Sequence, residues 1–230
     1  MTEAALLLEG VAKSFGRVQA VRDVGFRLER GSFVGLVGPN GAGKSTTIKM
    51  LAGQLMPDAG RIVVDGVDVV ADPGAARARL GYVPEEPSLY EYLSAREMVS
   101  FVARIRGTGD VDAALQIAGL GEDADRLIRE YSQGMRRRTA LACAMVARPP
   151  LLVLDESLNG LDPPSTERVV GALRAACEAG AAVLLSTHVL DTLERVADRV
   201  IMIERGAVSA DVPADRLPEL RARFATADAG

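Results

Sequence analysis

Apolar and polar residues alternate in two segments within the first thirty positions of the chain. Two segments with this period of two, 6–15 and 18–28, predict a pair of antiparallel strands. Residues 33–37 are all apolar or glycine, the pattern of a short strand that is buried on both faces. A helical pattern follows over 45–53, where Gly53 is suited to cap the C-terminus.

The pattern changes twice more in the first two thirds of the chain. Residues 60–69 and 79–83 return to strand. Residues 85–148, in contrast, carry only helical patterns, among them a helix over 94–107 that opens with a capping box. An inserted helical subdomain is therefore expected in the middle of the chain.

Strands and helices alternate again after residue 148. Strands are predicted over 151–155, 181–186 and 199–206, and a helix over 165–179 lies between the first two. This alternation favours a mostly parallel sheet that is covered on both faces. The predicted fold class is α/β, with an N-terminal antiparallel β-subdomain and the inserted helical subdomain.

The same boundaries define the expected domain organisation. Residues 1–217 form one domain, whose core comprises 1–84 and 149–217 and whose helical subdomain comprises 85–148. The tail, 218–230, is polar and rich in alanine, and we expect it to fray.

Composition and charge exclude several classes of protein. The 230 residues carry 27 basic and 31 acidic side chains and lack the basic excess of nucleic-acid binders, so no nucleic-acid partner is expected. The longest apolar run, 140–147, is far shorter than the roughly 18 residues that span a bilayer. The N-terminus shows no secretory pattern and the two cysteines show no metal-ligand spacing. These features predict a cytoplasmic protein.

Residues 38–46, GPNGAGKST, match the pattern G-x-x-x-x-G-K-[ST] between a predicted strand and a predicted helix. Its glycines allow backbone N–H groups and the helix N-terminus to point at polyphosphate oxygens. Lys44 would lie along the β- and γ-phosphates, and the Ser45 hydroxyl would ligate Mg²⁺. The motif predicts a P-loop NTPase (RecA-like) core. Its expected nucleotide-binding residues are Gly38, Pro39, Asn40, Gly41, Ala42, Gly43, Lys44, Ser45 and Thr46.

Two acidic residues end the predicted strand 151–155. Ligands bind at the carboxyl ends of the strands in open α/β sheets, so Asp155 would hold Mg²⁺ and Glu156 would orient or deprotonate the attacking water. The one histidine of the sequence, His188, follows the next predicted strand and would reach the γ-phosphate from the same edge. The alternatives are a helix cap for the two acids and a structural role for His188.

Together these motifs resemble the ATP-binding-cassette (ABC) ATPase family, the nucleotide-binding subunits of membrane transporters. Residues 131–135, YSQGM, are similar to the family's signature motif, and 159–162, NGLD, are similar to its D-loop. His188 matches its H-loop, and Glu156 matches the end of its acidic strand. Phe15 matches the position at which the family stacks an aromatic ring on adenine, with a core aromatic as the alternative.

The resemblance implies a particular assembly. Ser132 would cap a helix, and its hydroxyl and the Gly134 amide would bind the ATP of another subunit. This implies a head-to-tail dimer, with itself or with a second ABC ATPase, around two ATP molecules. Residues 82–86 and 131–138 look most like the branch that serves drug, antibiotic and polysaccharide exporters. Its permease is a separate membrane protein, expected to dock near Glu85–Arg96 and hold the subunit at the inner face of the membrane.

Three departures from the family pattern affect this interpretation. Glu85 replaces the usual glutamine, and as a carboxylate it is a candidate Mg²⁺ ligand. Beside a triphosphate it also adds a repulsion of roughly 3 kcal/mol per unit charge, at ~5 Å and an effective dielectric of about 20. Gln133 and Met135 alter the signature, and Ser157 and Leu158 replace the usual proline and threonine.

These features favour an ATPase subunit that dimerises on ATP and transmits closure to a permease. The alternative is a nucleotide-gated assembly or binding module with vestigial turnover, which the changes at Glu85 and Ser157 favour. Glu156 argues against that module, because a module without catalysis has no use for an acid there. A factor acting on nucleic acid fits poorly with the acidic charge balance.

Overall fold

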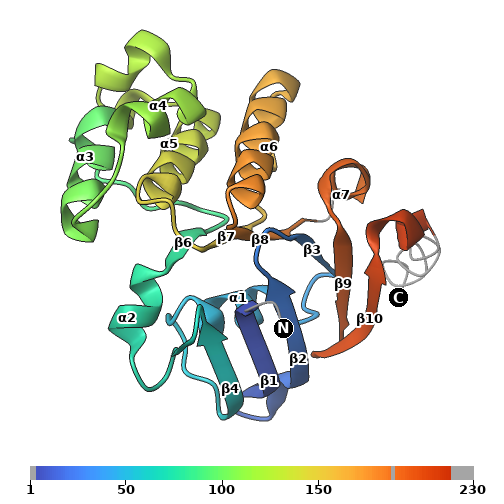
Figure 1. The fold of residues 1–230 in the computed structure, drawn as a ribbon. Coiled ribbons are helices and arrows are strands. Elements are labelled where there is room, and N and C mark those ends of the chain that lie inside the picture. The colour runs from blue at the N-terminus through green and yellow to red at the C-terminus, as the bar shows by residue number, and fades with distance from the viewer. Residues whose placement is uncertain (1–3, 188–189, 219–230) are drawn as a thin grey trace.

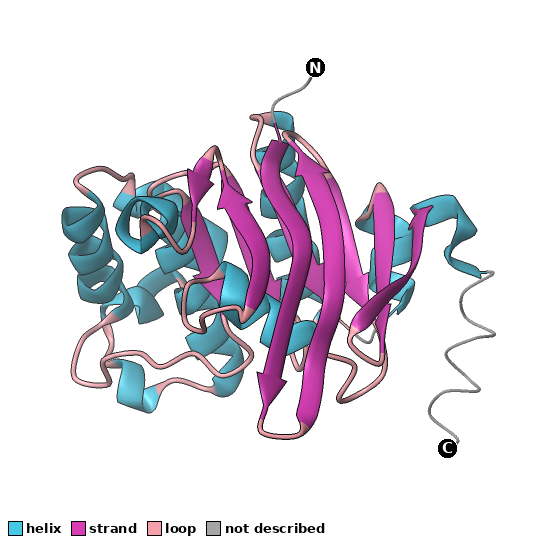
Figure 2. Cartoon of the chain, turned by 90° about the horizontal axis from the view of Figure 1, so that it is seen from below, coloured by secondary structure: helices cyan, strands magenta, loops and turns pink. Residues whose placement is uncertain are grey.

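Two β-sheets and a group of helices make up the computed structural model, which describes residues 4–187 and 190–218 (Figure 1). The smaller sheet is antiparallel and has the strand order β2-β1-β4-β5. Figure 2 shows its long strands side by side. Its strands are β1 (Ala4–Phe15), β2 (Val18–Glu29), β4 (Ala59–Val64) and β5 (Val67–Asp68).

The larger sheet has the strand order β10-β9-β3-β8-β7-β6. Its neighbouring strands are parallel except for β10, which runs antiparallel to β9, so the predicted mostly parallel sheet is confirmed. Every residue of β3, β7 and β8 is buried, as expected for central strands with both faces covered. Its strands are β3 (Phe33–Val37), β6 (Leu80–Val83), β7 (Leu151–Asp155), β8 (Ala182–Ser186), β9 (Arg199–Glu204) and β10 (Ala207–Pro213).

Helices cover the large sheet, and the segment between β6 and β7 consists of helices and their connections (Figure 1). No helix in the described ranges is both long and apolar enough to cross a membrane. The α-helices are α1 (Lys44–Leu51), α2 (Pro73–Ala78), α3 (Ala95–Arg106), α4 (Val111–Ala118), α5 (Gln133–Met145), α6 (Pro163–Glu178) and α7 (Leu190–Val196). Short 3₁₀ helices cover Gly121–Asp125, Ile128–Glu130 and Ala214–Arg216.

The two faces of the large sheet belong to different hydrophobic clusters. Val34 and Leu36 of β3 face a cluster that α1 and the small sheet complete. Phe33 and Val37 of the same strand face a second cluster, formed with α5, α6 and α7. A third cluster joins α3, α4 and α5. Helix α5 contributes to the second and the third cluster, so it connects the helical segment to the sheet.

The predicted helix starts and ends agree closely with the structure. Ser94 and Glu97 form the capping box of α3: the Glu97 N–H donates to Ser94 Oγ at 3.2 Å, and the Ser94 N–H donates to the Glu97 carboxylate at 2.8 Å. Helix α1 ends slightly earlier than predicted, with Ala52 as its C-cap and Gly53 following at φ 65°. Helix α6 begins at Pro163, two residues before the predicted start. A proline is well tolerated in the first turn of a helix.

Helix α2, helix α7 and strand β10 were not predicted from the hydrophobic pattern. Helix α2 has six residues, of which Ala76 is buried, so it is too short to show an apolar stripe. The Asp72 side chain caps it by accepting from the Ala75 N–H at 3.0 Å. Strand β10 lies at the sheet edge and is mostly half-buried, and it therefore lacks the clear alternation of an inner strand.

Candidate active site

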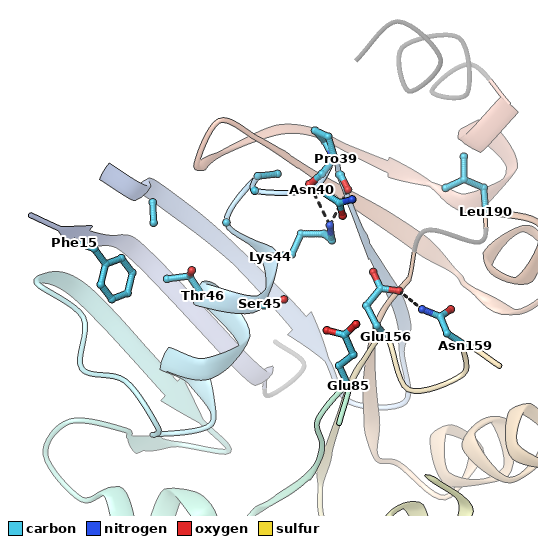
Figure 3. Close-up of a pocket in the computed structure, with 15 residues that line it drawn as sticks. Phe15, Pro39, Asn40, Lys44, Ser45, Thr46, Glu85, Glu156, Asn159 and Leu190 are labelled. Atoms are coloured by element: carbon cyan, nitrogen blue, oxygen red, sulfur yellow. Dashed lines mark hydrogen bonds between the residues drawn. The ribbon is translucent and has the colours of Figure 1, made fainter. Parts of the chain in front are cut away.

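The P-loop, residues 38–46, connects β3 to α1 and lines a cavity of about 720 Å³ (Figure 3). Two of its glycines, Gly38 and Gly43, are required by close packing. Gly38 has φ 151°, and a Cβ there would lie 2.1 Å from the Ile203 carbonyl oxygen. Gly43 has φ 105°, and a Cβ there would lie 2.5 Å from the Ala20 carbonyl oxygen. The strands on either side thus fix the path of the loop, and α1 begins at the cavity without a side-chain cap on its N–H groups.

The Lys44 side chain is held against the loop. It is 7% exposed, and its ammonium donates to the carbonyl oxygens of Gly38, at 2.7 Å, and Pro39, at 3.3 Å (Figure 3). A phosphate is a charged acceptor and binds an ammonium more strongly than neutral carbonyls do. The position of Lys44 therefore suits the binding of a polyphosphate.

Asp155 ends β7 and is not among the described residues that line the cavity. It is 3% exposed, and its Oδ1 has no hydrogen-bond partner among the described residues. Burial raises the pKa of the Asp155 carboxyl, and the charges of Glu156 and Glu85 raise it further, whereas the nearby hydroxyls of Ser45 and Ser186 lower it. A buried carboxylate oxygen without a partner is costly, so this arrangement fits a bound cation.

Glu156 adopts a strained backbone conformation, with φ 48°. Two hydrogen bonds hold its backbone: its N–H donates to the Ser186 carbonyl at 3.0 Å, and its carbonyl accepts from the Asn159 N–H at 3.2 Å. The Asn159 side-chain amide also donates to Glu156 Oε2 at 2.8 Å (Figure 3). This network aims the Glu156 carboxylate at the cavity. Asn159 lies in the predicted D-loop segment, but its contact with Glu156 was not predicted, because it depends on the left-handed backbone at Glu156.

The cavity brings together residues from distant parts of the sequence. Among the predicted residues, Phe15, Gly38, Pro39, Asn40, Gly41, Ala42, Gly43, Lys44, Ser45, Thr46, Glu85 and Glu156 line it. It is also lined by Ala20, Asn159 and Leu190, which were not predicted as site residues. Ala20 lies on β2, and nothing in its local sequence indicates that this strand packs beside the P-loop.

Phe15 lies at the rim of this cavity. Its side chain is 50% exposed, and the Lys13 ammonium lies 5.9 Å from the centroid of its ring. Half-exposure contradicts the alternative that Phe15 is a core aromatic. The ring remains accessible to a planar ligand at the cavity mouth.

The predicted signature residues lie elsewhere in the chain. Ser132 is the N-cap of α5, as expected, and its Oγ accepts from the Met135 N–H at 3.3 Å. Neither Ser132 nor Gly134 is among the described residues that line the cavity. His188 lies outside the described residues. Strand β8, which precedes it, is parallel to β7 and pairs Ser186 with Asp155.

A P-loop between β3 and α1, with an acidic pair at the end of the parallel strand β7, defines a P-loop nucleotide hydrolase. The sequence model of the ABC transporter family matches residues 21–159, and the chain belongs to this family.

Named relatives and a solved structure agree with this assignment. The chain is 36% identical over 223 residues to the daunorubicin resistance ATP-binding protein DrrA3 of Streptomyces coeruleorubidus, covering 94% of this chain and 71% of that protein. It is 39% identical over 223 residues to the Nod factor export ATP-binding protein I of Bradyrhizobium diazoefficiens, covering 94% of this chain and 73% of that protein. It is also similar to the structure of an ATP-binding subunit of an ABC transporter, with 31% identity, a TM-score of 0.87, and 97% and 94% of the two chains covered.

These similarities settle the class of activity. The chain is an ATP-binding and ATP-hydrolysing subunit of an ABC transporter. The predicted resemblance to the exporter branch is confirmed, because the relatives include drug-resistance and export proteins.

Proposed function

We propose that this chain pairs head to tail with a second ABC ATPase subunit around two ATP molecules, and drives export through a separate permease. The observation that carries the proposal is the division of the site. The cavity holds the P-loop and Glu156, whereas Ser132 and Gly134 lie at the N-terminus of α5, outside it. A capped helix N-terminus suits a phosphate, and here that phosphate would belong to ATP on the partner.

In this assembly the residues of the cavity divide the chemistry among them. Lys44 and the P-loop N–H groups stabilise the charge of the transferred phosphoryl group. Glu156 orients the attacking water and accepts its proton. Phe15 stacks on the adenine ring at the rim. We assign His188 to the γ-phosphate on the basis of the family motif, although it lies outside the described residues.

The proposed Mg²⁺ ligands are Ser45, Asp155 and Glu85. Mg²⁺ prefers oxygen ligands, and the buried, unpartnered Oδ1 of Asp155 fits such an ion. Glu85 and Glu156 line the same cavity, and their charges raise the pKa of the Asp155 carboxyl. When bound, Mg²⁺ neutralises charge on the phosphate oxygens.

Mixing two inactive variants tests whether the site is shared between subunits. Lys44→Met removes the P-loop ammonium and Ser132→Arg blocks the signature, so each variant alone should lose ATPase activity. If sites form between chains, a mixed dimer contains one intact site, and an equal mixture should recover about a quarter of the wild-type rate. ATP hydrolysis is measured before and after mixing.

The mixing experiment also has an outcome that contradicts the proposal. Recovery should not occur if Lys44 and Ser132 serve the same nucleotide within one chain. A mixture of Lys44→Met with Glu156→Gln provides the matched control, because both residues line the same cavity. That mixed dimer has one intact P-loop but no site with both residues, so it should not recover.

The proposed permease-docking surface lies on and beside α3. Its exposed apolar residues are Tyr90, Tyr92, Phe101 and Ile105, of which Tyr92 is 78% exposed. The rings of Tyr90 and Phe101 meet edge to face with 5.9 Å between centroids, and Phe101 and Ile105 are one helical turn apart. An apolar and aromatic patch of this kind suits an amphipathic helix at the cytoplasmic face of a permease.

The predicted docking segment Glu85–Arg96 contains two tyrosines and two leucines, which differ in exposure. Tyr90 and Tyr92 are exposed, whereas Leu89 and Leu93 are partly buried against the hydrophobic clusters. The two leucines therefore contribute to internal packing. The docking role is assigned to the tyrosines and to their α3 neighbours.

Tyr90→Ala should uncouple transport from hydrolysis. The side chain is 60% exposed, so its loss should leave the fold and the ATPase rate of the isolated subunit within about twofold of wild type. Transport by the subunit reconstituted with its permease should fall about tenfold, as for an interface aromatic. Met56→Ala, an exposed apolar residue after α1, is the control and should have no effect. Equal losses of transport and isolated ATPase activity would contradict the docking role.

A further inference from the structure

Glu85 brings a negative charge to the P-loop cavity from an exposed loop. It follows β6, and its carboxylate faces the space below Lys44 and Ser45, where Glu156 also points (Figure 3). Its charge reaches the buried Asp155 and raises the pKa of that carboxyl. Two acidic side chains that line the cavity, Glu85 and Glu156, therefore lie next to the position expected for the terminal phosphates.

The positive charge in this cavity is small by comparison. Of the described residues that line it, Lys44 alone carries a cationic side chain, and its ammonium is bound to two P-loop carbonyls. An ATP molecule without a metal ion brings about four negative charges to these carboxylates. A divalent cation reverses the interaction, because it attracts both the phosphates and the carboxylates.

A glutamine at position 85 would behave differently. Its amide oxygen is a possible Mg²⁺ ligand, but it carries no charge and does not repel free ATP. The carboxylate of Glu85 repels a phosphate charge at short range, and solvent and salt weaken this repulsion because the residue is exposed. We estimate the remaining effect on the binding of free ATP at about tenfold.

We propose that Glu85 is a specificity-determining residue that makes this cavity select metal-complexed ATP and reject the metal-free nucleotide. The inference rests on the proposed function, since it takes the cavity to be the ATP site. It concerns the nucleotide species that binds, and it is independent of whether Glu85 ligates the ion in the closed dimer.

The test is equilibrium binding of ATP to the full chain, measured by dialysis with labelled nucleotide. Each protein is titrated in excess Mg²⁺ and in EDTA at the same ionic strength. The ratio of the two affinities measures selectivity. In Glu85→Gln this ratio should fall about tenfold, and it should fall through tighter binding of metal-free ATP.

Two further variants control for charge and position. Glu86→Gln removes the same charge from the adjacent exposed residue, which is not among the described residues lining the cavity, and its ratio should match wild type. Glu85→Asp keeps the charge and should keep most of the selectivity. Thermal unfolding checks that each variant is folded.

The outcomes separate this inference from the function on which it rests. An unchanged ratio in Glu85→Gln would overturn the proposal. A ratio that falls only through weaker binding of Mg²⁺-ATP would overturn it too, because Glu85 would then act as a ligand without excluding free ATP. If wild-type protein binds no ATP in excess Mg²⁺, or if Lys44→Met leaves that binding unchanged, the assignment of the cavity itself fails.

Discussion

Glu156→Gln is expected to lower the rate of ATP hydrolysis by at least about a hundredfold and to leave ATP binding intact. The amide has the shape of the carboxylate but cannot accept a proton from water. Its side-chain oxygen can still accept the hydrogen bond that Asn159 donates at 2.8 Å, so the geometry of the turn should persist. The effect is therefore expected in turnover, with little change in folding.

The same substitution should trap the closed dimer. It removes a negative charge next to the phosphates and stops the step that would end the ATP-bound state. Size-exclusion chromatography with light scattering, with and without ATP and Mg²⁺, would show the variant change from monomer to dimer only with nucleotide. Glu178→Gln, at the exposed C-terminal end of α6, should behave as wild type in both measurements.

Two other outcomes would change the role assigned to Glu156 or the partner assigned to this chain. Wild-type turnover with normal dissociation would remove Glu156 from the catalytic role. A variant that binds ATP but stays monomeric would favour a partner of different sequence, or the nucleotide-gated module that the changes at Glu85 and Ser157 suggest.

The sequence predicted the parts of the fold that carry strong local signals. The buried strands β3, β7 and β8 are short apolar runs, and the capping box at Ser94 marks the start of α3. Helices α2 and α7 and strand β10 were missed because each is too short or buries too little to show a period. Their positions depend on tertiary packing, which a local pattern does not record.

The residues of the candidate site also differ in how well the sequence predicted them. The P-loop is contiguous and was predicted residue by residue, whereas Phe15 and Glu85 were identified through the family resemblance. The contact between Asn159 and Glu156 depends on the left-handed backbone at Glu156, which the sequence does not reveal. Ala20 reaches the cavity because β2 packs beside the loop, a contact between distant segments.

Strand β9 approaches the P-loop closely at Gly38, and this contact leads to the other large expected effect. Gly38→Ala should lower the free energy of unfolding by about 3 kcal/mol or more, because strain and overpacking act together. The new Cβ would lie 2.1 Å from the Ile203 carbonyl oxygen, a backbone atom of β9 that cannot rotate away, and φ is 151°. Strand β9 or the loop must move, and ATP binding should be lost as well.

Gly41→Ala separates the clash from the backbone strain in this comparison. Gly41 lies in the same loop at φ 76°, but a Cβ there meets nothing within 4 Å. Gly41→Ala should therefore lower the free energy of unfolding by about 1 kcal/mol, which is the strain of a left-handed alanine alone. Urea unfolding of the two variants beside wild type measures both values. If Gly38→Ala were no more destabilising than Gly41→Ala, contact with β9 would not fix the path of the P-loop, and the loop would have to tolerate a displacement that the Lys44 hydrogen bonds to Gly38 and Pro39 argue against.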